Sequence, residues 1–254
     1  MTGEAAPTLD RLAAEQATGA LLRDTGTLYF ADGQVVHAES PATPGIDVLL
    51  LKNGRLPAER WRMAIDEAGA RCQVGRFLVD NGHLGSGELE ICHLNTLFDA
   101  AYFALAPGGG PARFRRGVRH WLGPVRPVRA ESVERENRRR RELLARLWPY
   151  PQIDMAPVVR RPVAGAAVLS QRQRAVLALT DGVRTPNGIA WVLGRPAFHT
   201  LVDVRRLAAA GHIETPRAPA PQALPPRPAH VPDVFADPTP ALLRRLRDAL
   251  EATL

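Results

Sequence analysis

The chain has little of what secreted, membrane or zinc-binding proteins usually carry. Its 254 residues include only two cysteines, Cys72 and Cys92, which lie far apart and outside any CxxC pair, and this argues against a disulfide framework and a zinc site. No apolar run reaches the roughly 18 residues that a membrane-spanning helix needs. The first residues also lack the charged segment followed by an apolar segment that is typical of a signal peptide. We therefore expect a cytoplasmic protein with no membrane association, no cofactor and no metal.

Sequence motifs of enzyme active sites are also missing. The sequence has no GxSxG, HExxH, phosphate-loop or dinucleotide pattern, and the glycine run 108–110 precedes a proline, so we interpret it as a linker. The seven histidines do not stand beside acids at ligand spacing. His93 falls on the apolar face of an expected helix and is interpreted as a packing residue rather than a ligand. These absences indicate a protein that is not an enzyme.

Lysine is nearly absent, and arginine carries the positive charge. Lys52 stands alone, so 32 of the 33 basic residues are arginines. The formal net charge is +7 and the isoelectric point is about 10.5, which favours polyanionic partners. Residues 113–146 hold 12 arginines and 4 glutamates, a net charge of +8. This segment is either a solvated connector or a surface that contacts phosphates.

The N-terminal part has the spacing of a β-meander followed by helices. Three strands are expected at 18–23, 27–30 and 34–39, because the turn sequences DTG and ADG separate them. Helical patterns then begin near Gly45, Pro57, Gln73 and Ser86. Residues 112–130 follow as one or two strands whose arginines are either solvated or bind nucleic acid. The predicted fold class is α+β.

The middle of the chain predicts one long helix and an extended linker. Residues 131–148 begin acidic and end basic, with three Glu–Arg pairs at the favourable spacing of four, Glu131 to Arg135, Glu134 to Arg138 and Glu136 to Arg140. Residues 148–165 contain four prolines and no periodicity, which predicts an extended linker.

Residues 169–215 predict a winged helix. Helical patterns cover 170–180, 186–193 and 196–210, and the breaks between them have local causes. Thr185 is a helix cap followed by a first-turn proline, and Gly194 and Gly211 end the second and third helices. Residues 212–215 remain as a short strand, the first arm of a wing.

The C-terminal region contains a proline-rich tail and a last helix. Nine prolines fall in residues 216–240, which excludes helix and central strand there. Residues 239–254 then place five leucines on one helical stripe. The stripe packs either on its own protein or against a second copy.

Two segments resemble known families. Residues 18–38, with TGALL, TLYF and DGQVVHA, resemble the PATAN-like domain of bacterial signalling proteins, which implies an interaction or sensory module without catalytic residues. Residues 172–214 are similar to the winged helices of MarR-type transcriptional regulators, with RTPNGIAWVLGR as the positioning helix and LVDVRRLAAAGHIE ending the recognition helix. The order of these segments resembles actinobacterial regulators that combine both modules.

Five segments follow from these patterns and resemblances. They are a PATAN-like module (8–129), a basic helix with a proline-rich linker (130–165), a winged helix (166–216), a proline-rich tail (217–238) and an amphipathic helix (239–254).

We predict a transcriptional regulator that binds double-stranded DNA through the winged helix and is regulated through, or recruited by, the N-terminal module. The alternative is a signalling adaptor in which both modules bind proteins. A protein partner at the N-terminal module and a homodimer are further expectations. With Leu207 on the core side of the third helix, a turn of 100° per residue directs His199, Val202, Asp203, Arg205 and Arg206 outward. The predicted DNA-binding residues are Arg184, Arg195, His199, Arg205 and Arg206, with Arg138, Arg139, Arg140 and Arg141 as auxiliary phosphate contacts.

Overall fold

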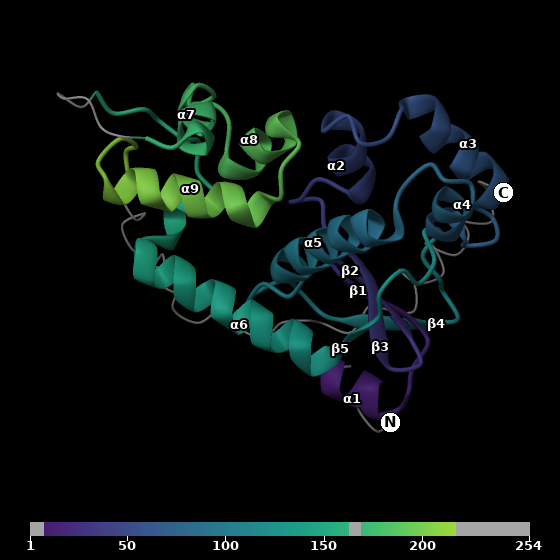
Figure 1. Ribbon diagram of the computed structural model, residues 1–254. Coiled ribbons are helices and arrows are strands. Elements are labelled where there is room, and N and C mark those ends of the chain that lie inside the picture. Colours follow the sequence, from purple (N-terminus) through teal and green to yellow (C-terminus); the bar gives the residue numbers. More distant parts are fainter. Residues whose placement is uncertain (1–7, 163–168, 217–254) are drawn as a thin grey trace, which may run out of the picture. The chain divides into compact units, whose positions relative to one another are not determined.

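The computed structural model describes residues 8–162 and 169–216, and every structural statement below refers to them. They form a mixed α+β structure with a five-stranded antiparallel sheet (Figure 1). The chain divides into two units, and the second, Arg217–Leu254, lies outside the described residues. The predicted tail (217–238) and amphipathic helix (239–254) therefore lie outside them as well. Among the described helices, none combines the length and the apolar character needed to cross a membrane.

The sheet has the order β4-β1-β2-β3-β5. Its centre is the predicted meander, and short edge strands flank it: β1 (Gly19–Arg23), β2 (Gly26–Ala31), β3 (Gln34–Glu39), β4 (Arg113–Arg116) and β5 (Val128–Arg129). Tyr29 pairs with His37 whereas Phe30 pairs with Val35, so Val36 is an extra residue that bulges from β3. The three arginines of β4 are exposed at the sheet edge, as the solvated-strand interpretation expects.

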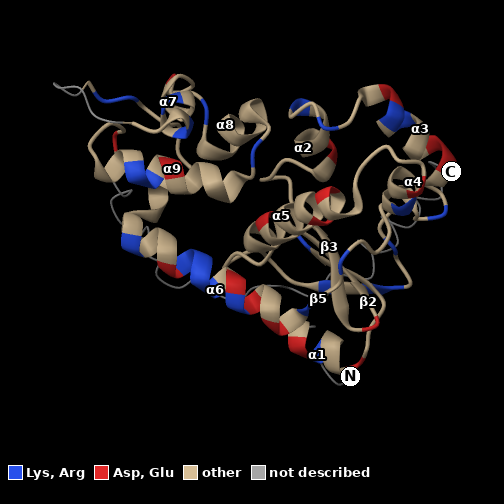
Figure 2. Ribbon diagram, in the orientation of Figure 1, with Lys and Arg blue, Asp and Glu red and all other residues tan. Residues whose placement is uncertain are grey.

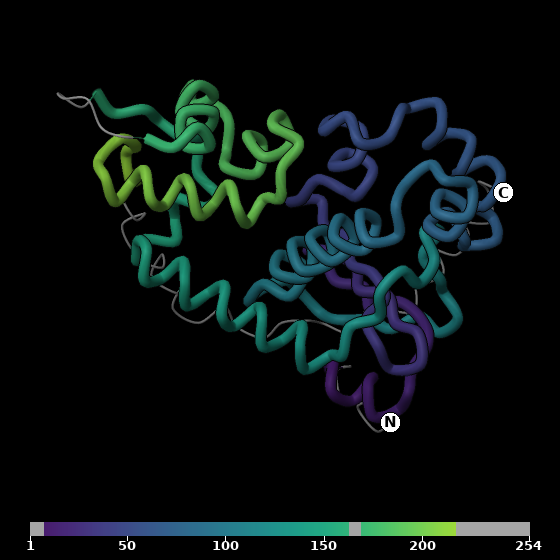
Figure 3. The backbone as a smooth tube through the Cα atoms, viewed as in Figure 1, coloured from purple at the N-terminus to yellow at the C-terminus, as the bar shows by residue number. Residues whose placement is uncertain are grey.

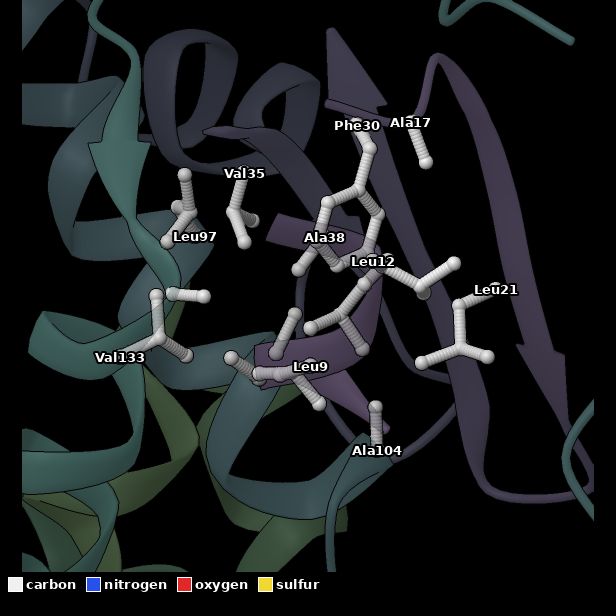
Figure 4. Packing of buried hydrophobic residues seen from close by; sticks show 14 residues of the cluster. Leu9, Leu12, Ala17, Leu21, Phe30, Val35, Ala38, Leu97, Ala104 and Val133 are labelled. Atoms are coloured by element: carbon white, nitrogen blue, oxygen red, sulfur yellow. The ribbon is translucent and has the colours of Figure 1, made fainter. Parts of the chain in front are cut away.

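The main core forms where three helices pack against the sheet (Figure 4). These helices are α1 (Leu9–Ala14), α5 (Ser86–Ala104) and α6 (Ala130–Leu147). Strand β1 contributes Leu21, β2 contributes Leu28 and α5 contributes Leu97, all at most 1% exposed. Burial of these apolar side chains is the main stabilising term for this part of the chain.

A second apolar cluster lies beside the first. It joins α2 (Ile46–Lys52), α3 (Ala58–Ala68) and α4 (Val74–Asp80) to the first turns of α5 and to Leu122. The rings of Trp61 and Trp121 meet edge to face at its border, with centroids 5.5 Å apart. The predicted helices after the meander are therefore confirmed.

The C-terminal part of the described chain is a three-helix unit: α7 (Gln171–Leu177), α8 (Pro186–Leu193) and α9 (Ala197–Ala209). Ser170 and Gln173 form a reciprocal capping box at the start of α7. Thr185 caps α8 and Gly194, at φ +60°, ends it, so both predicted signals are confirmed. These local caps set where each helix begins and ends.

Two segments differ from the sequence prediction. Residues 151–154, expected to be extended, form a 3-10 turn (Pro151–Asp154) whose Ile153 is only 1% exposed because it enters the core of the three-helix unit. The predicted wing strand at 212–215 makes one antiparallel bridge, Ile213 to Arg160, and so pairs with the segment before α7. Up to Pro216 the described residues contain no second wing strand.

Candidate functional site

Helix α9, the predicted recognition helix, is buried on two sides. Val204 and Leu207 face the core of the three-helix unit, with α7 and α8. On the other side, Phe198, Leu201 and Val202 pack with Leu144 of α6, and α6 and α9 lie side by side (Figure 1, Figure 3). A recognition helix must leave one face open for the major groove. In this arrangement α6 covers Val202 and Arg205 on the face that the sequence assigns to DNA, whereas His199 and Arg206 stay exposed.

Arg205 is a structural residue, which corrects its prediction as a DNA contact. It is 4% exposed and makes a two-pronged ion pair with Asp154, with Nε to Oδ1 at 2.9 Å and Nη2 to Oδ2 at 2.6 Å. Its Nη1 donates to the carbonyl oxygens of Leu144 at 2.8 Å and Trp148 at 2.6 Å. The last carbonyls of a helix have no partner within the helix, so Arg205 caps the C-terminal end of α6.

Asp99 of α5 caps the N-terminal end of α9. Because Pro196 has no capping oxygen, Asp99 accepts the free N–H groups of Ala197 at 2.6 Å and Phe198 at 2.8 Å. Burial raises the pKa of Asp99 to about 6, against the two backbone hydrogen bonds and the nearby Arg140, which lower it. Asp99 therefore ties the start of α9 to α5, whereas Arg205 ties the later part of α9 to the end of α6.

Arg140 is also buried, which corrects its prediction as a phosphate contact. It is 8% exposed, lies 4.5 Å from the ring centre of Phe198 and donates to the carbonyl oxygen of Phe98 at 3.0 Å. It also pairs with Glu136 at 2.9 Å, the only one of the three predicted Glu–Arg pairs that the described helix forms. An arginine held in this way contributes to packing and cannot reach a phosphate.

Two further residues of the predicted outward face are also covered. Val202 is 9% exposed, and Asp203 is 6% exposed with Arg172 at 3.8 Å from its carboxylate. The placement of Val202, Asp203 and Arg205 on an open face is therefore wrong. The reason is that helical periodicity identifies one buried face, whereas α9 packs against two layers.

The other predicted DNA-binding residues of the three-helix unit make no hydrogen bond or ion pair with one another in the described structure. Arg184 is exposed and pairs with Asp181, and Arg195 is partly buried. His199 keeps solvent contact, but burial and the positive charges of Arg172 and Arg140 lower its pKa. A neutral His199 adds no positive charge towards DNA. Arg206 is exposed on α9.

Several arginines lie along helix α6 (Figure 2). Some of their side chains are exposed. Arg138 is exposed, Arg139 pairs with Glu136 at 2.8 Å, and Arg141 donates to the carbonyl oxygen of Leu105 at 2.7 Å. Exposed pairs of this type are weak, so these side chains remain able to approach a polyanion.

A cluster of three histidines lies outside the predicted site. His37 of β3 stacks on His120 with ring centres 3.8 Å apart and on His93 of α5 at 5.4 Å. Glu39, two residues after His37, accepts from His120 Nε2 at 2.9 Å and from the hydroxyl of Tyr29 at 2.9 Å. His93 is fully buried, and its Nε2 lies 2.7 Å from the carbonyl oxygen of Val36, the bulged residue. His93 is thus a packed residue, as expected.

The electrostatics of this cluster favour neutral His37 and His93 near an ionised Glu39. Burial, together with the neighbouring rings of His120 and His93, holds the pKa of His37 well below its usual value. Burial also lowers the pKa of His93. The hydrogen bond from His120 lowers the pKa of Glu39, and burial raises the pKa of Tyr29. Nδ1 of His37 and Nδ1 of His93 are buried without a hydrogen-bond partner in the described structure.

The expectation that no histidine stands beside an acid at ligand spacing missed this cluster. His37 and Glu39 stand two apart and so share one face of a strand, which is the one local signal that was present. His120 lies 81 residues from Glu39, and only the fold brings them together. Comparisons with known proteins add no assignment: no family model, no curated protein and no solved structure matches this chain.

Proposed function

We propose that the chain is a non-enzymatic signalling adaptor that binds proteins and does not read DNA with α9. The observation that carries the proposal is the burial of Val202 and Arg205, which stand where a recognition helix needs open polar side chains. Opening that face would separate α9 from α6 and would break the ion pair between Arg205 and Asp154. The PATAN-like resemblance of residues 18–38 supports the same interpretation, since it implies an interaction module.

Helix α8 offers a surface suited to a protein partner. Trp191 is 39% exposed and Val192 is 47% exposed at neighbouring positions. Aromatic residues are enriched in protein interfaces because they bury a large area at little entropic cost. A surface of this kind supports protein binding and offers nothing to phosphates.

The second candidate is binding of duplex DNA by a winged-helix regulator, and the exposed arginines of α6 favour it. Arg138, Arg139 and Arg141 lie on one helix, and Arg206 is exposed on α9. Arginines of this kind give binding that depends on phosphate charge, falls steeply with salt and carries little sequence information.

An anisotropy titration with a set of genomic duplexes distinguishes the two functions. The adaptor proposal predicts no sequence-dependent binding at about 50 mM salt, where phosphate contacts are strongest. Any residual binding should disappear by about 200 mM salt and in the double variant Arg138→Gln, Arg139→Gln. It should be unchanged in Arg206→Ala, the matched control on α9. Tight binding to one duplex over the others that Arg206→Ala removes would overturn the adaptor proposal in favour of the regulator.

A further inference from the structure

The buried histidine cluster contains a set of donor atoms suited to a metal ion. One ligand atom each from His37, Glu39 and His120 lies within 4.8 Å of the other two. In a tetrahedral zinc site, bonds of about 2.0–2.2 Å place neighbouring ligand atoms roughly 3.4 Å apart. His120 Nε2 and Glu39 Oε1 are already 2.9 Å apart. Because the lone pair of an imidazole nitrogen lies in the ring plane, a rotation that turns one ring of the stacked His37 and His120 pair would direct all three atoms at one cation.

We propose that His37, Glu39 and His120 bind one divalent transition-metal cation of the zinc type. Two imidazole nitrogens and a carboxylate oxygen suit zinc and other divalent transition metals such as iron, whereas calcium and magnesium prefer oxygen alone. None of the three ligands belongs to α6, α8 or α9, although Trp191 of α8 lines the same cavity as His37 and Glu39.

The unpartnered nitrogen of His37 is the observation that points to a ligand. His37 is 2% exposed, and its Nδ1 has no hydrogen-bond partner in the described structure. A buried polar atom without a partner is costly, and native structures rarely keep one without an ion or a water. A neutral imidazole offers its lone pair without first losing a proton.

The neighbours of the three residues would orient them. Tyr29 donates to Glu39 Oε2 at 2.9 Å, which leaves Oε1 directed at His120. Ligating carboxylates in metal sites are commonly held by such a hydrogen bond. A cation that takes the Nε2 lone pair of His120 displaces the proton shared with Glu39, and the ring proton moves to Nδ1. Without the cation, His120 Nδ1 accepts from the N–H of Leu122 at 3.3 Å, and this long hydrogen bond would be lost when Nδ1 takes the proton.

The cation can be reached from solvent. A cavity of about 400 Å³ is lined by His37 and Glu39 together with Trp121, and another of about 290 Å³ is lined by Tyr29 and His120. The side chain of Glu39 is 47% exposed. Three protein ligands leave a fourth position of a tetrahedral cation for water or an exogenous anion.

The test is zinc binding by the tag-free full chain after removal of metal with a chelator. Calorimetry or competition with a coloured chelator should give one Zn²⁺ per chain. Substitution with Co²⁺ should give the intense visible absorption of a tetrahedral site. His37→Phe and Glu39→Gln should each weaken binding by at least about 100-fold, and Tyr29→Phe by about 10- to 100-fold.

Glu88→Gln is the matched control. Glu88 is also a surface carboxylate, 38% exposed and paired with an arginine, Arg55, at 3.0 Å. This variant should bind zinc as the unmodified chain does. Glu39→Gln keeps the size and polarity of the side chain at an exposed position, so folding is retained and can be verified by circular dichroism. Absence of 1:1 binding at micromolar Zn²⁺, or equal affinity in Glu39→Gln and Glu88→Gln, would overturn the proposal.

Discussion

Replacing Arg205 with alanine should lower the free energy of unfolding by about 3–5 kcal/mol, because it breaks a buried ion pair and leaves the partner charge in place. Asp154 would lose hydrogen bonds of 2.9 and 2.6 Å, and the carbonyl oxygen of Trp148 would lose the Arg205 donor. The carbonyl oxygen of Leu144 would lose Arg205 but keep the N–H of Trp148 at 3.0 Å. For a chain of this size each 1 kcal/mol corresponds to about 2–4 °C in Tm, so the loss is about 6–20 °C.

The matched control is Arg206→Ala, one residue further along α9. Arg206 is exposed, so this change should remain within about 0.5 kcal/mol of the unmodified chain. Urea unfolding followed by circular dichroism measures both variants, and the slope with denaturant shows whether the unfolding reaction is the same. If Arg205→Ala is as stable as Arg206→Ala, Arg205 does not cap α6 and the buried contact between α6 and α9 is not present in solution.

Three further variants test the contacts that hold α7, α8 and α9 in place. Because burial raises the pKa of Asp99 from 3.8 to about 6, its contribution to stability is greatest below pH 3.8 and falls by about 3 kcal/mol as pH rises to about 6. The free energy of unfolding measured against pH should show this fall, and Asp99→Asn should lack it. Gly194→Ala should lower the free energy of unfolding in urea by about 1–3 kcal/mol, because Gly194 has φ +60° and an added Cβ would lie 2.8 Å from the Cβ of Lys52. Gly211→Ala is the control: its added Cβ meets no atom within 4 Å, so this variant bears only the conformational cost of a positive φ. Ser170→Ala should cost about 1 kcal/mol by removing the capping box with Gln173, and an equal stability would show that α7 does not depend on its cap.

Local features of the sequence predicted most of the helices and the central strands correctly. The turns around Gly26 and Gly33 fixed the meander, and Thr185, Pro186 and Gly194 fixed both ends of α8. These signals act over a few residues, so they can be read without knowing the fold. The PATAN-like and winged-helix identities stay predictions.

Contacts between distant segments were not predictable in the same way. Arg205 has the outward position of a DNA-binding residue, and its partner Asp154 lies 51 residues earlier in a segment expected to be an extended linker. Asp99 caps a helix that begins 98 residues later. A charged residue on a helix looks the same in sequence whether its partner is a phosphate or a buried carboxylate. Only the packing of the folded chain decides which partner such a residue has, and here it buries Arg140 and Arg205.

Thiol labelling at position 202 tests most directly whether α9 is closed. Val202→Cys would be made in a chain whose own Cys72 and Cys92 are replaced by serine and alanine, and Ala209→Cys, an exposed position on the same helix, is the control. A closed α9 requires that the thiol at 202 reacts much more slowly than the thiol at 209, both alone and in the presence of duplex DNA. Equal labelling rates at 202 and 209, or a gain in the rate at 202 when DNA is added, would contradict it.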